Sequence, residues 1–222
     1  MSDAGDRRYL GRGYQGAVYT TGEGAARVVV KEPIGRGLAR RLRLAMLRHE
    51  HRAYQRLAGI VGIPPCLGLR PDGSLALAFV AAEPFHESAP ALRDRDAYFA
   101  ALRDIVLACH RAGVAHGDLK RRGNVLIDAA GQPWVLDFGT AVLARGRGGW
   151  LFRLACRMDL NAWIKLKYRR RYDAIAPDDA PYYRPTWVEG LARTFRRGFR
   201  KLTARRWRKA RRLRRSGGAG GR

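Results

Sequence analysis

Hydrophobic and polar positions change their spacing several times along the chain. Short runs of β-branched or alternating apolar residues predict strands. These runs lie at residues 9–10, 17–20, 28–31, 67–69, 75–80, 125–127 and 134–136. Glycines separate the first two runs, and the turn Pro71-Asp72-Gly73 separates the next close pair. The last two runs flank Ala129-Ala130-Gly131 and predict a hairpin.

Helical spacing, with an apolar residue every three or four positions, alternates with these strands. It covers residues 38–58, 96–112, 150–171 and 187–213. Ile63-Pro64-Pro65 is the predicted stop of the first helix, and Gly113 that of the second. Ser216–Arg222 is glycine-rich and predicted to be disordered. The pattern as a whole predicts an α+β fold that is rich in strands first and helical later.

Length and charge narrow the class of protein. With 222 residues and 46% hydrophobic content, the chain is long enough for one compact unit or two small lobes sharing a cleft. The net charge is +25, and residues 191–222 alone carry 14 Lys or Arg and no acid. Such a charge attracts polyanions: nucleic acid, anionic lipid or a phosphorylated sugar. It does not by itself indicate any chemistry.

Targeting and cysteine patterns favour a cytoplasmic protein. No apolar run reaches 18 residues, so we expect no membrane span, and Met1–Gly13 lacks the apolar stretch of a secretory signal. Cys66, Cys109 and Cys156 form no CxxC pair, so neither a disulfide framework nor a zinc site is expected.

The first motif with chemical meaning is Gly11-x-Gly13-x-x-Gly16-x-Val18. Glycines allow a hairpin to close over phosphates, because no Cβ blocks the backbone amides. A turn-rich hairpin without a ligand is the simpler alternative. A strand rather than a helix follows the glycines, which favours a kinase-type loop over a dinucleotide loop.

Lys31 ends the Val28-Val29-Val30 strand, and Glu50 is the only carboxylate between Glu32 and Asp72. Each of these two residues could also be present for a reason unrelated to catalysis. The lysine would flank the sheet in solvent, and the glutamate would relieve repulsion in a helix full of arginine. The placement of Glu50 on the helix after the lysine strand favours an ion pair between the two.

Two further motifs follow the second helix. His116-Gly117-Asp118-Leu119-Lys120-Arg121-Arg122-Gly123-Asn124 precedes a strand, and Asp137-Phe138-Gly139 follows one. The simpler explanation of the first motif is a polar loop capped by Asp118. The simpler explanation of the second is that the tripeptide occurs by chance. The joint order of glycine loop, strand lysine, helix glutamate, HxDxK loop and strand-DFG decides against coincidence.

From Tyr9 to Thr140 the chain resembles the protein kinase superfamily. The resemblance implies a two-lobed fold with an N-lobe at residues 1–80, a reduced C-lobe at 84–190 and a basic helix with a glycine-rich tail at 191–222. It also implies that ATP lies in the cleft, under the flap of Gly11, Gly13, Gly16 and Val18. The hinge would lie near Ala81, Ala82 and Glu83, whose backbone would meet adenine.

The resemblance further assigns roles to single side chains. Lys31, held by Glu50, would bind the α- and β-phosphates. Asp118 would orient or deprotonate the acceptor hydroxyl, and Lys120 would neutralise the γ-phosphoryl group. Asn124 and Asp137 would bind Mg²⁺. Asp159, in the middle of the 150–171 helix, resembles the kinase aspartate that braces the catalytic loop. The alternative is that Asp159 is an ordinary acidic residue on the surface of its helix.

Some residues depart from the usual kinase pattern. The loop has His-Gly-Asp in place of His-Arg-Asp, five residues rather than four separate Asp118 from Asn124, and no Ala-Pro-Glu follows the DFG. We expect a bulge at Gly123 to absorb the extra residue. His-Gly-Asp resembles RIO-type, aminoglycoside-phosphotransferase and bacterial lipopolysaccharide-kinase branches.

Three functions stay open from the sequence. The first is a kinase acting on a hydroxyl, on Ser/Thr of a protein or on a lipopolysaccharide core sugar. The second is a nucleotide-binding pseudokinase or basic scaffold on membrane or RNA, and the third an RNA-linked kinase of RIO type. The basic C-terminal helix suits an anionic membrane surface, which would place the protein at the cytoplasmic face of a membrane. RNA ranks behind lipid, and packing on the rest of the protein is the plain alternative.

Overall fold

A computed structural model of the chain describes residues 7–13, 16–88, 92–121, 123–146 and 148–185. Contacts divide the chain into a compact unit, Met1–Tyr183, and a second unit, Arg184–Arg222. The predicted helix at 187–213 and the predicted disorder at 216–222 lie outside the described residues. The boundaries that we predicted for two lobes and a tail stay a prediction.

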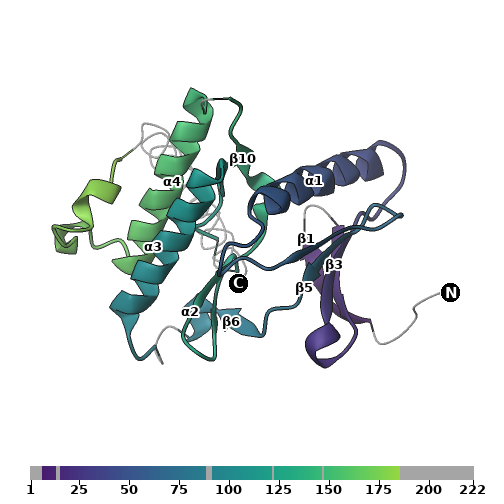
Figure 1. Ribbon diagram of the computed structural model, residues 1–222, viewed down its shortest axis with the longest axis horizontal. Coiled ribbons are helices and arrows are strands. Elements are labelled where there is room, and N and C mark those ends of the chain that lie inside the picture. Colours follow the sequence, from purple (N-terminus) through teal and green to yellow (C-terminus); the bar gives the residue numbers. More distant parts are fainter. Residues whose placement is uncertain (1–6, 14–15, 89–91, 122, 147, 186–222) are drawn as a thin grey trace, which may run out of the picture. The chain divides into compact units, whose positions relative to one another are not determined.

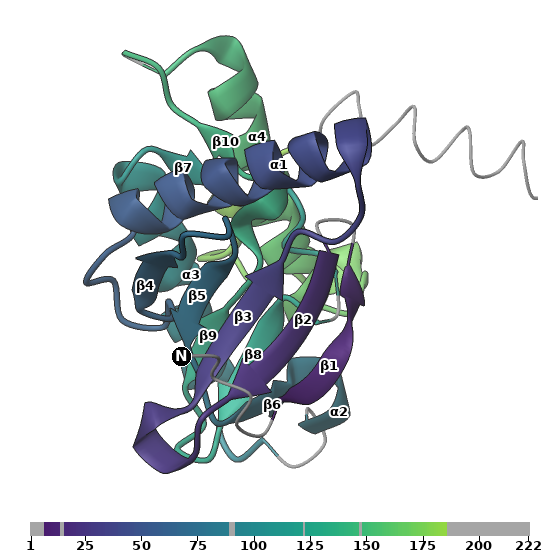
Figure 2. The same ribbon diagram turned by 90° about the vertical axis from the view of Figure 1, so that its right-hand side faces the viewer.

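The N-terminal part is rich in strands, as the sequence predicts. Its antiparallel sheet has the order β1-β2-β3-β5-β4. The strands are β1 (Arg8–Gly13), β2 (Gly16–Thr21), β3 (Val28–Glu32), β4 (Cys66–Leu69) and β5 (Leu75–Ala78). A 3-10 turn, η1 (Gly24–Ala26), joins β2 to β3. Figure 2 shows the strands in this order below α1 (Gly37–Arg56), which packs against β4 and β5.

Helices and two small sheets make up the rest of the first unit, so the described part of the chain is α+β. The helices are α2 (Phe85–Ser88), α3 (Arg95–Arg111) and α4 (Trp150–Lys167), with 3-10 turns η3 (Phe138–Thr140), η4 (Tyr172–Ala174) and η5 (Ala180–Tyr182). One sheet has the order β6-β8-β9, from β6 (Ala82–Pro84), β8 (Val125–Asp128) and β9 (Pro133–Val135). The other pairs β7 (Val114–Ala115) with β10 (Val142–Leu143). Helices α3 and α4 run side by side (Figure 1).

One continuous apolar core connects these elements. It includes Leu47 and Tyr54 of α1, Phe99 of α3, Phe138 of η3 and Trp163 of α4. The indole of Trp163 is hydrogen-bonded within this core: it donates to the Phe99 carbonyl at 2.8 Å. Because a single core joins the strand-rich and helical parts, the residues between them are held on a rigid framework.

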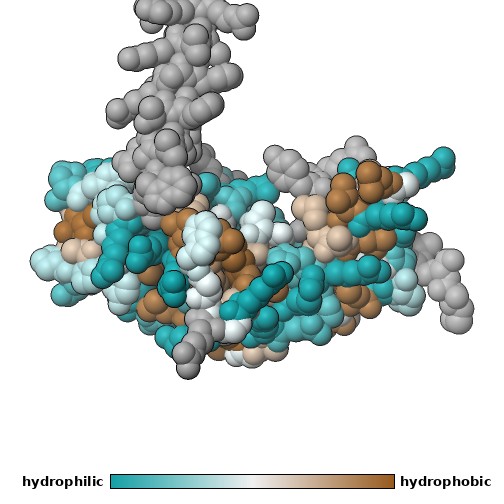
Figure 3. Space-filling model, turned by 90° about the horizontal axis from the view of Figure 1, so that it is seen from above, coloured by the Kyte–Doolittle hydropathy of each residue, from teal (hydrophilic) through white to brown (hydrophobic). Residues whose placement is uncertain are grey.

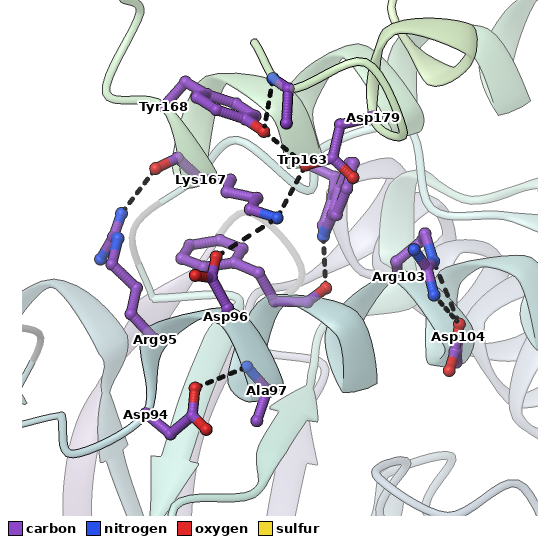
Figure 4. Close-up of polar contacts among 12 residues, drawn as sticks. Asp94, Arg95, Asp96, Ala97, Arg103, Asp104, Trp163, Lys167, Tyr168 and Asp179 are labelled. Atoms are coloured by element: carbon purple, nitrogen blue, oxygen red, sulfur yellow. Dashed lines mark hydrogen bonds and ion pairs between the residues drawn. The ribbon is translucent and has the colours of Figure 1, made fainter. Parts of the chain in front are cut away.

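A polar cluster fastens the segment after α4 to the helices (Figure 4). The Lys167 ammonium lies 2.7 Å from an Asp179 carboxylate oxygen, to which the Tyr168 hydroxyl also donates. Arg95 donates to the carbonyls of Leu166 and Lys167, two of the unpaired acceptors at the C-terminal end of α4. These bonds explain why the chain from Tyr172 to Tyr183 belongs to the first unit.

Some predicted boundaries are wrong. Helix α1 ends at Arg56, because Leu57 leaves helical geometry and Gly59 follows with φ of 82°; the prolines at 64 and 65 lie well beyond its end. Helix α4 ends at Lys167, before Arg169 and Arg170, whose positive φ values are incompatible with a continuing helix. Within the described part of the chain, each helix is too short or too polar to cross a bilayer.

Candidate active site

Lys31 occupies the centre of the strand-rich sheet. It lies on β3, directly opposite Val18 of β2 and Leu75 of β5. Its ammonium is 2.6 Å from an oxygen of Glu50 and 3.1 Å from an oxygen of Asp137. The lysine side chain is only 13% exposed. One cation thus joins the sheet to α1 and to the segment after β9.

Glu50 reaches this position because α1 turns its buried face toward the sheet. Leu47, Glu50 and Tyr54 follow one another at spacings of three and four, and all are buried. The Glu50 side chain is 0% exposed, so its contact with Lys31 is an internal one. The predicted ion pair is confirmed. The second Glu50 oxygen and the Tyr54 hydroxyl are buried without a partner among the described residues.

The charges in this cluster shift one another's pKa. Burial lowers the pKa of Lys31, but the negative charges of Glu50 and Asp137 outweigh it and raise that pKa above its ordinary value. Burial raises the pKa of Asp137, but Lys31 outweighs it and the net pKa is lowered. Burial, reinforced by the Glu50 charge, raises the pKa of Tyr54 well above its usual range. At neutral pH the cluster therefore holds a charged Lys31 and a charged Asp137.

Asp137 has an uncommon backbone conformation. Its φ of 66° and ψ of 73° lie in the left-handed region, where residues other than glycine are rare. The next residue, Phe138, is fully buried and meets the rings of Tyr54 and His116 at 5.2 and 4.9 Å. This packing holds Asp137 in its strained conformation. Backbone strain of this kind is found most often at functional sites.

The loop from His116 to Asn124 is braced from α4. The Asp159 carboxylate is buried and accepts the backbone N–H groups of His116 at 2.6 Å and Gly117 at 2.9 Å. The His110 ring lies 3.1 Å from the same carboxylate. The predicted contact between Asp159 and the loop is therefore confirmed.

Gly117 is required by the local backbone. Its φ is 78°, and a Cβ there would lie 2.7 Å from the Thr140 carbonyl oxygen. A side chain would be strained by its conformation and would also meet a backbone atom that cannot turn away. This close approach gives a physical reason for glycine in the His-Gly-Asp motif.

Hydrogen bonds tie this loop to the Asp137 segment. The Asp118 N–H donates to His116 Nδ1, so the other ring nitrogen carries hydrogen and donates to the Leu136 carbonyl at 2.8 Å. The Leu136 N–H donates to the Asn124 carbonyl at 2.9 Å. Asp118 and Asp137 are therefore held on one bonded framework. In the described part of the chain the Asp118 carboxylate has no partner.

The extra residue of the loop is absorbed by two successive turns. The Arg121 N–H donates to the Asp118 carbonyl, and the Asn124 N–H donates to the Arg121 carbonyl. Asn124 is buried and its amide donates to the Asp118 carbonyl at 3.0 Å. Gly123 is described and has ordinary φ, while residue 122 lies outside the described residues.

The sequence interpretation missed Arg121. Its guanidinium lies 3.7 Å from the second oxygen of Asp137. Lys120 is exposed, and among the described residues it forms no ion pair with Asp137. The only signal in the sequence was the pair of further cations, Arg121 and Arg122, directly after Lys120. Arg121 and Lys120 therefore both remain candidates for contacting a transferred phosphoryl group.

The glycine hairpin and the hinge are positioned by backbone pairing. Gly13 lies opposite Gly16 across β1 and β2, and a Cβ on Gly16 would collide with the Glu32 carbonyl at 1.8 Å. Gly11 lies on β1, and residues 14 and 15 at the tip lie outside the described residues. Glu83 lies on β6 opposite Ile127. Glu83 also lines a cavity of about 880 Å³ that neither Lys31 nor Asp137 lines.

The donor set suits a hard cation held jointly with phosphates. Asp137 offers a carboxylate that is 35% exposed, and Asn124 offers an amide oxygen, since its amide nitrogen is bound to Asp118. Mg²⁺ prefers oxygen ligands and commonly takes only one or two from protein beside substrate phosphates. The described residues contain no group of three His, Cys, Asp or Glu side chains that could hold a metal ion.

Comparison with known proteins agrees with this arrangement, although no family model matches the chain. CBL-interacting protein kinase 4 of Oryza sativa subsp. japonica is 34% identical over 187 residues, covering 77% of this chain and 40% of that protein. The 3-deoxy-D-manno-octulosonic acid kinase of Xylella fastidiosa strain M12 is 36% identical over 69 residues, covering 31% of this chain and 27% of that protein. These partial matches are consistent with a protein kinase-like superfamily.

A third kinase-like relative shows how partial these matches are. CBL-interacting serine/threonine-protein kinase 26 of Arabidopsis thaliana is 39% identical over 82 residues, covering 36% of this chain and 18% of that protein. The chain spans 17% to 40% of the length of the curated relatives it matches. The relatives include both serine/threonine and sugar-acid kinases by name. The RIO-type part of the kinase-like resemblance stays a prediction.

Proposed function

We propose that the chain is a two-lobed, ATP- and Mg²⁺-dependent phosphotransferase that transfers the γ-phosphoryl group to a hydroxyl. The observation that carries this proposal is the Lys31 ammonium, held between Glu50 at 2.6 Å and Asp137 at 3.1 Å. The three residues come from positions 31, 50 and 137, and their contacts support the roles that the kinase resemblance assigns to them. In the proposed arrangement the strand-rich part is the N-lobe and the helical part a reduced C-lobe.

The residues divide the work between binding and proton transfer. Lys31 binds the α- and β-phosphates, and Glu50 keeps its ammonium in place. Asp118, whose carboxylate has no partner among the described residues, accepts the proton of the acceptor hydroxyl. Asp137 and Asn124 hold Mg²⁺, which when bound neutralises charge on the β- and γ-phosphates. The backbone of residues 81–83 meets adenine, and Gly11, Gly13, Gly16 and Val18 cover the phosphates.

The proposed acceptor is a hydroxyl of a lipopolysaccharide core sugar or of Ser/Thr in a protein. The partial relatives support both classes, since one is named for a sugar acid and another for serine and threonine. The His-Gly-Asp motif, which resembles that of bacterial lipopolysaccharide kinases, favours the sugar. We further propose a cytoplasmic location, with access to the membrane face where a lipid-linked sugar would be met; RNA ranks behind lipid as a partner.

Labelled ATP tests the reaction and the acceptor together. The protein is incubated with Mg²⁺, γ-labelled ATP and fractionated bacterial lysate, and lipid-linked sugar is separated from protein. Label in the sugar fraction supports the sugar acceptor, and label in protein supports Ser/Thr. Nucleotide binding without transfer to either fraction, and without phosphate release, would favour the nucleotide-binding scaffold over a kinase.

Asp118→Asn separates catalysis from binding. Removing a general base costs roughly 100-fold or more in rate, while nucleotide binding is unchanged because Asp118 is not assigned to ATP. Asp104→Asn is the matched control, since its side chain is 66% exposed on α3 and, among the described residues, pairs with Arg103 alone. Full transfer by the Asp118 variant would remove the role assigned to that carboxylate.

A further inference from the structure

The outward side of α1 carries a row of three exposed arginines. Arg41, Arg48 and Arg52 are spaced by seven and four residues, so they point in nearly the same direction, and all three are exposed. At about 1.5 Å rise per residue they span roughly 16 Å of the helix axis. The only carboxylate of α1 is Glu50, which is buried and bound to Lys31. In the described part of the chain no acidic side chain pairs with any of the three arginines.

Exposed leucines lie beside this row. Leu38 is 73% exposed and Leu42 is 58% exposed, one turn apart in the first half of α1. Together with the arginines they give α1 a second, outward amphipathic face, opposite the one that packs on the sheet. Solvated charges alone would not require the leucines, and large apolar side chains next to one another at the surface mark contact sites.

A second apolar feature lies on the same side of the first unit. Trp150 and Leu151, at the beginning of α4, are 62% and 56% exposed. Figures 1 and 2 both show α1 and the first turn of α4 on the upper side. Seen from above, hydrophobic and hydrophilic surface lie next to each other (Figure 3). Tryptophan is the residue most typical of the interface between lipid and water.

We propose that this face, formed by α1 and the first turn of α4, docks on an anionic lipid surface. The arginines would meet lipid phosphates, while Leu38, Leu42 and Trp150 would enter the boundary between headgroups and acyl chains. Charge complementarity selects an anionic partner. The exposed apolar residues select lipid over nucleic acid, whose backbone is bound by charge and hydrogen bonds.

Vesicle binding by charge-matched variants of the full chain tests the proposal. Binding is measured to phosphatidylcholine vesicles with and without phosphatidylglycerol. The first variant is Arg41→Gln, Arg48→Gln, Arg52→Gln. We expect it to bind the anionic vesicles at least tenfold more weakly, because each arginine near an anionic surface contributes to binding. Far-ultraviolet circular dichroism and the thermal midpoint verify that these exposed changes leave the fold intact.

The control removes the same charge from elsewhere in the unit. It is Arg93→Gln, Arg170→Gln, Arg171→Gln, three exposed residues outside α1. Both variants keep residues 191–222, so the basic C-terminal segment contributes equally to each. We expect less than a threefold effect in this control. Equal losses in both variants would mean that binding follows net charge, and the α1 surface would be rejected.

The proposed insertion of Leu38, Leu42 and Trp150 into lipid is tested separately. Leu38→Asn with Leu42→Asn should weaken vesicle binding most at high salt, where charge is screened and apolar insertion remains. Brominated lipids should quench fluorescence of the intact protein more than that of Trp150→Phe. Equal quenching of both proteins would overturn the insertion of Trp150. Unchanged vesicle binding together with loss of RNA binding in the arginine variant would assign this face to nucleic acid instead.

Discussion

Replacing Asp159 by asparagine tests how the catalytic loop is held. The carboxylate accepts two backbone N–H groups, from His116 at 2.6 Å and Gly117 at 2.9 Å, and is 1% exposed. An amide keeps one oxygen and presents an NH₂ group where the other was, so one buried N–H loses its acceptor and faces another donor. An unsatisfied buried donor costs about 1–3 kcal/mol, and the lost charge weakens the remaining bond. We expect Asp159→Asn to lower the free energy of unfolding by about 2–4 kcal/mol.

Urea unfolding measures this loss directly. With a dependence of about 2 kcal/mol per molar urea, in the middle of the usual range, the midpoint should fall by about 1–2 M. Asp104→Asn, at an exposed helix position, should change the free energy by less than about 0.5 kcal/mol. Under native conditions the folded variant should transfer phosphate more slowly, since the loop carrying Asp118 has lost a fixed point. An unfolding free energy within about 0.5 kcal/mol of the parent would refute the bracing role.

Two further predictions concern the loop and the segment after α4. Gly117→Ala should destabilise the protein by at least about 1 kcal/mol in a denaturant titration, because alanine is strained at positive φ and its Cβ would press on the Thr140 carbonyl; an unchanged midpoint would show that the loop relaxes freely. Burial raises the pKa of Asp179, but the bonds to Lys167 and Tyr168 outweigh it, so the net pKa is lowered from its ordinary value of 3.8. The stability that the charged Asp179 contributes is therefore fully present above the ordinary pKa and is lost as the pH falls through the folded pKa. The difference in thermal midpoint between the parent and Asp179→Asn should therefore be constant from pH 5 to 8 and shrink below about pH 4, whereas exposed Asp178→Asn should show little difference at any pH.

Local patterns in the sequence predicted the elements that carry the site. Helical spacing over 38–58 predicted α1, and the hairpin expected at 125–136 is β8 and β9. Glu50 could be found because it is the only acid in a long basic stretch, so any partner for Lys31 on that helix had to be Glu50. The contact with Asp159 could be predicted only by resemblance, since nothing local relates residue 159 to residue 116.

Features that depend on residues distant in the chain could not be predicted from the sequence. Strands β6, β7 and β10 have only two or three residues each and exist because a partner strand lies beside them, so their sequences carry no periodic signal. The position of Arg121 beside Asp137 depends on two successive turns in the loop. Sequence spacing could not choose between it and Lys120, because adjacent residues in a turn point in different directions.

Two unfavourable features meet at one place in this fold, and their coincidence argues for a functional site. A buried ion pair contributes little net stability, and apolar residues of similar volume at Lys31 and Glu50 would often be as stable or more so. Asp137 adds a left-handed backbone conformation that glycine would adopt at lower cost. Stability alone therefore explains neither feature. Both are explained if the lysine and the aspartate must face a phosphate-bearing ligand as charged groups in fixed positions, which is what the proposed phosphotransfer requires.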